Sequence, residues 1–188
     1  MKAYTFPNGF RIIYDKPKSK LHLTSILGFV KIGSIYEPSN LKGVCHFIEH
    51  MCFKGTKNKS LSTIINYYDN IGAYFNAYTE KEYTCYEIKC SDDHIKNSIH
   101  ILSDLLLNSS FKKEDFTKEY KVVIEENIKE EDDMENIWME KASSLLYEGT
   151  PYANPIDTLQ YHKNKKMKYE DVLHFIIIFI NHIIWSLV

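Results

Sequence analysis

Two histidines and a glutamate within five residues form the clearest chemical pattern in this sequence. The stretch reads His46-Phe47-Ile48-Glu49-His50. If it is helical, His46 and His50 lie one turn apart on the same face, where their imidazoles can share one metal ion. Glu49 reaches that face too, and its carboxylate can take a proton from a water bound to the metal. The pattern therefore predicts a metal site that activates water.

The order His-x-x-Glu-His is that of the inverted zinc-peptidase motif, and chance is the competing explanation. The chain has 8 histidines among its 188 residues, so this pattern would arise by chance in roughly a few per cent of such sequences. A zinc site with an open catalytic position needs a third protein ligand, and a carboxylate distant in sequence would complete a His2Glu set. His94 and His100, on an amphipathic stretch, are predicted to be surface and packing residues.

The sequence around the motif predicts a mixture of strands and helices. Segments rich in β-branched and aromatic residues predict strands at 10–14, 21–32, 74–79 and 83–89. The first two are expected to form a hairpin-like pair. Helices are predicted at 43–53, 60–71 and 93–107, with one or two charged helices over 113–147 and a final helix or strand from about 169. Ser60 is the expected N-cap of the second helix and Gly72 its expected terminator. This order predicts an α+β fold, with helices packed on one face of an antiparallel sheet.

Composition argues against several classes of partner and location. The chain carries 23 basic and 25 acidic residues, for a net charge of −2, which implies neither nucleic acid nor an acidic membrane surface as a partner. Four loosely spaced cysteines are too few for a disulfide framework, so we expect reduced thiols. The first residues lack the apolar core of a signal peptide, which predicts a cytoplasmic location.

The composition of the sequence changes in its C-terminal residues. Residues 173–188 are nearly all apolar, yet this stretch is short for a membrane span and is interrupted by polar side chains. We therefore expect no membrane partner. The predicted organisation is a zinc-binding domain over residues 1–175, followed by an apolar tail over 176–188.

The motif and its continuation resemble a known family. Residues 46–56 read His-Phe-Ile-Glu-His-Met-Cys-Phe-Lys-Gly-Thr, which is similar to the signature of the pitrilysin, insulin-degrading enzyme and mitochondrial processing peptidase family of zinc metallopeptidases. The resemblance covers residues 1 to about 157 and implies the N-terminal half of one subunit. Its other segments are Phe6–Arg11, Gly33–Glu37, Asn76–Thr79, Glu82–Thr84 and Asn108–Ser109.

The resemblance implies the remaining members of the site. It assigns the third ligand of one Zn²⁺ per chain to Glu126, and it gives Glu119, seven residues earlier, a supporting role that places it with Glu49 among the catalytic residues. Residues seven apart on a helix share a face, so Glu119 is expected to act behind Glu126. Glu125 is the competing candidate for the third ligand, but it points about 100° away from Glu126.

The activity implied by the resemblance is zinc-dependent cleavage of peptides or unfolded segments, with Glu49 as general base. The predicted strand at 74–79 resembles the family's edge strand, which pairs with an extended peptide. Its expected substrate-binding residues are Phe75, Asn76, Ala77 and Thr79. Two alternatives stay open: a truncated, inactive zinc-binding fragment, and a peptide-binding subunit without cleavage. A homodimer or a partner subunit is expected to supply the missing half.

Overall fold

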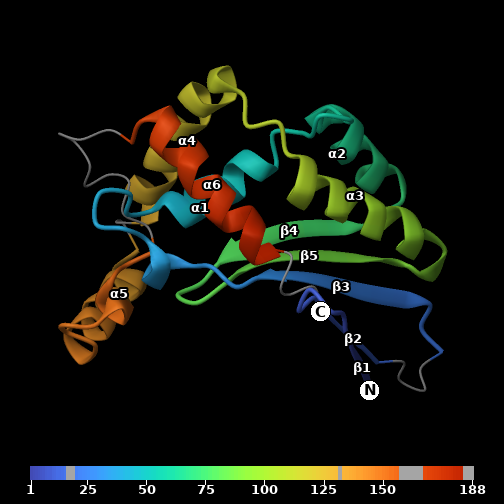
Figure 1. Ribbon diagram of the computed structural model, residues 1–188, viewed down its shortest axis with the longest axis horizontal. Coiled ribbons are helices and arrows are strands. Elements are labelled where there is room, and N and C mark those ends of the chain that lie inside the picture. The colour runs from blue at the N-terminus through green and yellow to red at the C-terminus, as the bar shows by residue number, and fades with distance from the viewer. Residues whose placement is uncertain (16–19, 131–132, 157–166, 184–188) are drawn as a thin grey trace.

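The larger of two antiparallel sheets forms the base of the structure. The computed structural model describes residues 1–15, 20–130, 133–156 and 167–183. In the larger sheet, β5 (Thr84–Ser91) lies between β3 (Leu23–Val30) and β4 (Tyr74–Thr79). The smaller sheet pairs β1 (Lys2–Thr5) with β2 (Arg11–Tyr14). Helices cover one face of the larger sheet (Figure 1), which confirms the predicted α+β class.

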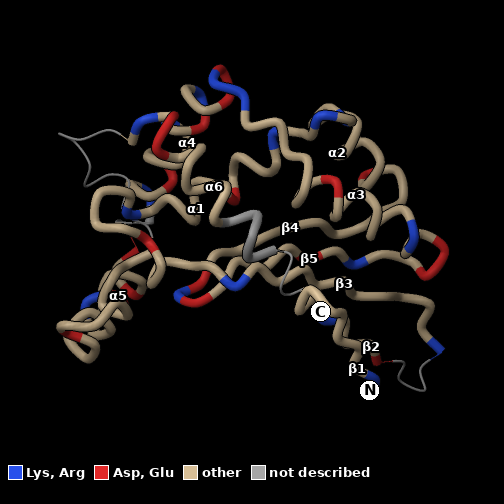
Figure 2. The backbone as a smooth tube through the Cα atoms, in the orientation of Figure 1, with Lys and Arg blue, Asp and Glu red and all other residues tan. Residues whose placement is uncertain are grey.

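The helices form the second layer. Helices α1, α3 and α6 contact the larger sheet, and α4 packs against α1. The charged stretch predicted as one or two helices forms two, α4 and α5, over which acidic and basic positions are interspersed (Figure 2). The α-helices of the described residues are α1 (Val44–Cys52), α2 (Leu61–Asn70), α3 (Ile95–Asn108), α4 (Lys113–Glu130), α5 (Met134–Leu146) and α6 (Tyr169–Ile183).

The predicted pairing of the first two strands is wrong. β2 pairs with β1, and β3 instead pairs with β5 along its whole length, from Leu23 opposite Ser91 to Val30 opposite Thr84. β1 was not predicted at all. Its residues, Lys-Ala-Tyr-Thr, include no β-branched aliphatic pair like that of β2, Arg-Ile-Ile-Tyr, so the composition that predicts a strand is missing.

The capping residues predicted for α2 are confirmed. Ser60 is the N-cap, and its side chain accepts a hydrogen bond from the backbone N–H of Thr63. At the other end, Gly72 has a φ of +62°, in the left-handed region that glycine adopts without steric cost.

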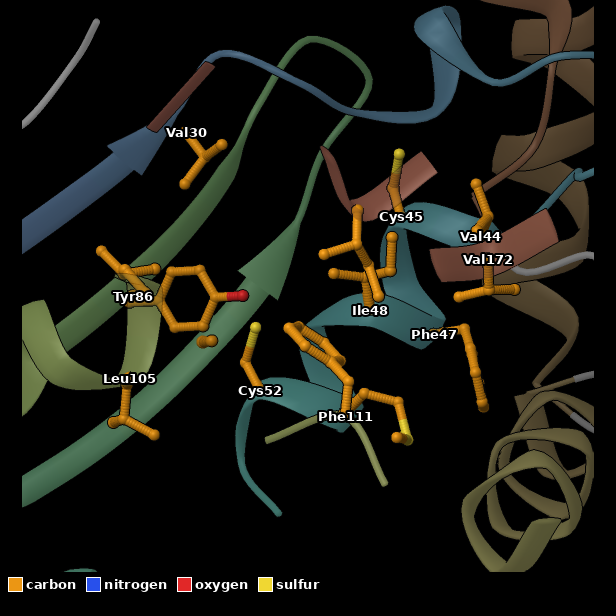
Figure 3. Packing of buried hydrophobic residues seen from close by; sticks show 14 of the residues in the cluster. Val30, Val44, Cys45, Phe47, Ile48, Cys52, Tyr86, Leu105, Phe111 and Val172 are labelled. Carbon is orange, nitrogen blue, oxygen red and sulfur yellow. The ribbon is translucent and has the colours of Figure 1, made fainter. Parts of the chain in front are cut away.

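Helix α1 lies at the centre of the core. Seven of its nine residues are buried, and Val44, Phe47 and Ile48 of this helix belong to one buried cluster with Tyr86 of β5 and Val172 of α6 (Figure 3). Burying large apolar side chains of this kind stabilises a fold by about 1.5–3 kcal/mol each. The two residues of α1 that are not buried are the two histidines of the motif, so the packing of the helix decides which way they face.

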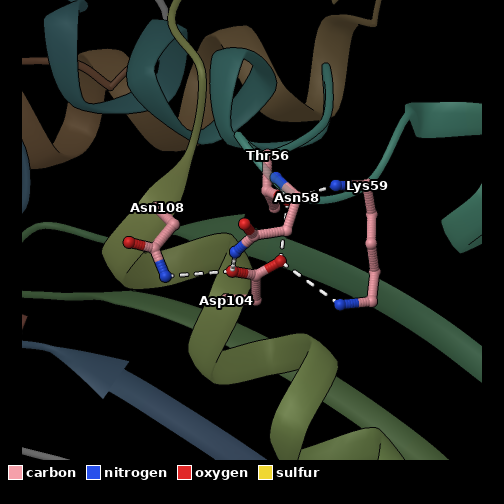
Figure 4. A network of polar contacts seen from close by, with 5 residues as sticks. All are labelled: Thr56, Asn58, Lys59, Asp104 and Asn108. Atoms are coloured by element: carbon pink, nitrogen blue, oxygen red, sulfur yellow. Dashed lines mark hydrogen bonds and ion pairs between the residues drawn. The ribbon is translucent and has the colours of Figure 1, made fainter.

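The loop after α1 is fixed to α3 by one buried carboxylate. Asp104 of α3 is 5% exposed and accepts hydrogen bonds from Thr56 Oγ1 at 2.7 Å, Asn58 Nδ2 at 2.6 Å and Asn108 Nδ2 at 2.9 Å (Figure 4). Lys59 Nζ lies 3.5 Å away. Thr56 also pairs with Ser109 in an isolated β-bridge. This Asp104 network ties the segment that follows the motif to a helix of the core.

Helix α6 continues through the predicted domain boundary at residue 175. Phe175 and Ile176 are 4% and 5% exposed and belong to the core, whereas Ile177 and Ile178 are exposed. The end of the predicted tail, residues 184–188, lies outside the described residues. Within the described ranges, no helix has the length and apolar content needed to span a membrane.

The Asp104 network predicts an acid-dependent loss of stability. Burial raises the pKa of Asp104, but its hydrogen bonds and the charge of Lys59 outweigh burial and hold the pKa below its ordinary value. A carboxyl with a lowered folded-state pKa stabilises the fold above its unfolded pKa, and that contribution is lost as the pH falls through the folded pKa. We expect Asp104→Asn to lower the free energy of unfolding at pH 7 by about 1–3 kcal/mol, and by less near pH 3, as measured by urea unfolding.

The matched control is Asp93→Asn, at an exposed position just before α3. It should leave the free energy of unfolding within about 0.5 kcal/mol of the wild type. Equal losses for the two variants, or a loss in Asp104→Asn that does not change with pH, would contradict the role given to the network.

Candidate metal centre

The start of α1 is held by a side chain from outside the helix. Glu37 is 5% exposed, and its carboxylate accepts hydrogen bonds from the backbone N–H of Gly43 at 2.7 Å and of Cys45 at 2.8 Å. Gly43 itself has a φ of +80°, which favours glycine at this position. Burial raises the pKa of Glu37 to about 7, against the lowering effect of those hydrogen bonds. The contact fixes where α1 begins and therefore the phase of its histidines.

The two histidines of α1 face each other. His46 Nε2 and His50 Nε2 are 3.0 Å apart, and the rings meet edge to face with centroids 4.7 Å apart. His50 Nδ1 lies 3.0 Å from a Glu119 carboxylate oxygen, which is an acceptor only. The Nδ1 of His50 is therefore positioned to donate to Glu119, which leaves the Nε2, facing His46, as the nitrogen that can bind a metal.

Helix α4 brings a carboxylate to the same point. Glu126 Oε2 lies 3.2 Å from His50 Nε2, and the ligand atoms of His46, His50 and Glu126 all lie within 4.8 Å of one another. The helices are held in this arrangement by Phe47 of α1, whose ring packs against Phe116 of α4 with centroids 5.0 Å apart. The competing residue, Glu125, is exposed and does not belong to this cluster.

This donor set fits a zinc ion. Two imidazole nitrogens and one carboxylate oxygen form one of the ligand sets of catalytic zinc, and zinc–ligand distances of about 2.0–2.1 Å in a tetrahedral site put the ligand atoms about 3.3 Å apart. The separations of 3.0 Å between the histidines and 3.2 Å between His50 and Glu126 are close to that value.

Glu119 stands behind His50. Its side chain is 6% exposed, and its two oxygens contact His50 Nδ1 at 3.0 Å and Lys54 Nζ at 2.5 Å. Glu119 was expected to act behind Glu126. In the structure the face of α4 that carries both residues points Glu119 at His50 of α1 instead. Burial raises the pKa of Glu119, but the contacts with His50 and Lys54 outweigh burial and lower it.

Glu49 lies on the inner side of the cluster. It is 7% exposed, and its Oε2 accepts a hydrogen bond of 2.7 Å from Thr79 Oγ1 of β4. Burial raises the pKa of Glu49, while the hydrogen bond from Thr79 and the nearby His46 and His50 act in the opposite direction without cancelling it. A carboxylate with a raised pKa is a better proton acceptor than an exposed one.

A pocket of about 520 Å³ opens over these groups. Its lining includes Asn76, Ala77 and Thr79 of the strand predicted to bind substrate. Phe75 is not part of the lining, because its ring packs against Phe53 and Tyr68 with centroids 4.9 and 4.6 Å away. The full lining is His46, Glu49, His50, Phe53, Lys54, Asn76, Ala77, Tyr78, Thr79, Glu119, Glu126, Asn127 and Ile156.

Several lining residues were not predicted from the sequence. Lys54 could have been found, because it follows His50 by four residues, the same spacing that separates His50 from His46. Tyr78 lies within the predicted strand and could have been included. Asn127 and Ile156 carry no signal in the sequence, since only the packing of α4 and of the segment after α5 brings them to the pocket.

Comparisons with known proteins place the chain among peptidases. A family model described as Insulinase (Peptidase family M16) matches residues 16–158. An uncharacterized zinc protease of Rickettsia felis is 38% identical over 126 residues, which are 67% of this chain and 31% of that protein. The uncharacterized zinc protease YmxG of Bacillus subtilis is 36% identical over 156 residues, or 83% of this chain and 38% of its own.

Two further matches extend the comparison to a eukaryotic relative and to a solved structure. The mitochondrial-processing peptidase subunit beta of Caenorhabditis elegans is 35% identical over 161 residues, which are 83% of this chain and 34% of that subunit. A crystal structure of a protease from Helicobacter pylori matches 96% of this chain and 44% of its own with a TM-score of 0.84, at 22% identity, which shows the same fold.

These matches identify the family, although the chain matches only part of the length of its relatives. The chain spans about a third of the length of the curated relatives it matches. The family model nevertheless covers most of the chain, and the resemblance predicted from residues 46–56 is confirmed. The protein belongs to the insulinase family of peptidases, peptidase family M16.

Proposed function

We propose that this protein takes part in zinc-dependent cleavage of peptides or unfolded segments. The observation that carries the proposal is the position of the buried Glu49 carboxylate beside the cluster of His46, His50 and Glu126, in one pocket with an edge strand. Relatives named as zinc proteases support the choice of metal.

Different residues of the site would bind the metal and transfer the proton. His46, His50 and Glu126 would hold the zinc, which when bound supplies a water of lowered pKa and polarises the substrate carbonyl. Glu49 would take the proton of the attacking water and pass it to the leaving amine. Thr79 donates to one Glu49 oxygen, which leaves the other to face the reacting atoms.

Strand β4 would position the substrate. Among the described residues it pairs with a strand on one side only, where β5 lies. The backbone groups on its other side are therefore available to an extended peptide, which would add to the sheet as one more strand. Asn76, Ala77 and Thr79 of β4 line the pocket, so a peptide paired there would pass over Glu49 and the metal ligands.

We further propose that a second copy of the chain or a partner subunit completes the working enzyme. The chain spans about a third of its curated relatives, and one of those relatives is named as a subunit of a processing peptidase. The alternative function is that of a zinc-binding or peptide-binding part that does not cleave alone. Both functions use the same metal cluster, so they differ in turnover and not in metal binding.

The ligand assignment predicts that Glu126 matters and Glu125 does not. We expect Zn²⁺ bound at one site to stabilise the wild-type chain against thermal unfolding. The stabilisation should be about 2.7 kcal/mol when the free zinc concentration is 100 times the dissociation constant. Glu126→Gln should lose most of this stabilisation, because it replaces a charged ligand with a neutral amide. The measurement is the melting temperature as a function of buffered free zinc.

Glu125→Gln is the matched control, since it makes the same chemical change one position away on an exposed side chain. It should respond to zinc like the wild type. The reverse outcome, with zinc stabilisation lost in Glu125→Gln and retained in Glu126→Gln, would overturn the assignment.

The role of Glu49 predicts a separation of metal binding from cleavage. We expect Glu49→Gln to retain one zinc per chain and to lower cleavage of a quenched fluorescent peptide library by about 10²–10⁴-fold, because the amide cannot accept the proton. Zinc content and peptide cleavage are measured on the same samples, with and without a chelator. Stoichiometric zinc without cleavage in the wild type would favour the non-cleaving alternative, and cleavage unaffected by Glu49→Gln would exclude Glu49 as the base.

A further inference from the structure

Lys54 is a basic residue beside the metal cluster, and the proposed mechanism gives it no task. It follows α1 and lines the pocket, whose other lining residues include no lysine or arginine. Its Nζ lies 2.5 Å from Glu119 Oε2, while Glu119 Oε1 lies 3.0 Å from His50 Nδ1. One carboxylate thus joins the ammonium group to the outer nitrogen of a predicted ligand.

The Glu119 carboxylate needs both of these contacts. Its side chain is 6% exposed, and a buried carboxylate is costly unless it is paired with a charge and hydrogen-bonded. His50 occupies only one oxygen. Without Lys54 the other oxygen would lose this charged partner, and the carboxylate would no longer be held in the orientation that faces His50.

The backbone on both sides of Lys54 is held by hydrogen bonds that do not involve the ion pair. The Lys54 N–H donates to Met51 O at 3.1 Å, which continues the hydrogen bonding of α1. Beyond it, Gly55 O accepts from Ser110 N at 3.0 Å, and Thr56 is held by Asp104. A lysine anchored in this way loses less conformational freedom on pairing than one on a free surface loop.

We propose that Lys54 is a positioning residue of the metal centre: it holds the Glu119 carboxylate so that His50 keeps its proton on Nδ1 and turns Nε2 toward His46 and Glu126. The inference rests on the proposed function, because it deepens the account of the same site. Lys54 acts through Glu119 and His50 and does not itself touch the substrate or the metal.

The opposing interpretation is an ordinary ion pair at the rim of a pocket. The Lys54 side chain is 27% exposed, and exposed pairs contribute little to stability. Such a pair would leave the tautomer of His50 and the affinity for metal unchanged when Lys54 is replaced. The two interpretations therefore differ in quantities that can be measured without any peptide substrate.

The test compares Lys54→Met, which keeps the length of the side chain without its charge, with Lys54→Arg, which restores a cation. Lys57→Met serves as the control, since Lys57 is a neighbouring exposed lysine. Nitrogen NMR of the imidazole rings in metal-free protein reports the His50 tautomer. Competition with a chromophoric chelator gives the Zn²⁺ affinity, and the visible spectrum with Co²⁺ reports the ligand geometry.

Lys54→Met is expected to lose the preference for the Nδ1–H tautomer, to bind zinc about 10–100-fold more weakly and to change the Co²⁺ spectrum. Lys54→Arg should recover most of each property, and Lys57→Met should match the wild type. An unchanged tautomer and affinity in Lys54→Met would overturn the inference, as would an equal loss in Lys57→Met.

Failure of the metal site itself gives a different result. If the wild type binds neither Zn²⁺ nor Co²⁺, the proposed function is wrong. The tautomer still decides the inference in that case: a shift confined to Lys54→Met supports the positioning role, and no shift excludes it.

Discussion

The burial of α1 constrains every polar group around it. The helix lies between the sheet, α6 and α4, so a carboxylate near it loses water and must find a partner within the protein. Glu37 finds two backbone N–H groups, Glu49 finds the hydroxyl of Thr79, and Glu119 finds His50 and Lys54. The partners fix the side chains, and the site is therefore shaped before any ligand binds.

Much of the site follows from helical spacing, which is a local property of the chain. The four-residue step from His46 to His50 and the seven-residue step from Glu119 to Glu126 each put two side chains on one face, and the structure brings these two faces together. Spacing cannot say which turn of α1 meets which turn of α4. That depends on aromatic packing between the helices. Glu119 was therefore expected to act behind Glu126, whereas in the structure it contacts His50.

The parts of the fold that the sequence predicted poorly are those that give no local signal. β1 (Lys-Ala-Tyr-Thr) has no run of β-branched residues like that of β2, and the partner of β3 is set by a strand some sixty residues later, beyond any local pattern. Phe75 was expected in the pocket because it lies in the right strand. It shares a face of β4 with Ala77 and Thr79, but it lies nearer the start of the strand, where its ring packs against Phe53 and Tyr68 instead.

The distance in sequence between the two halves of the site has a consequence for how the chain matures. His50 and its carboxylate partner Glu119 are 69 positions apart, and synthesis proceeds at about 5–20 residues per second. For several seconds a nascent chain holds the two histidines without Glu119 and Glu126. If His46, His50 and Glu126 hold zinc as proposed, tight binding of the metal would wait until α4 has docked on α1. Metal loading would then follow the packing of these two helices rather than precede it.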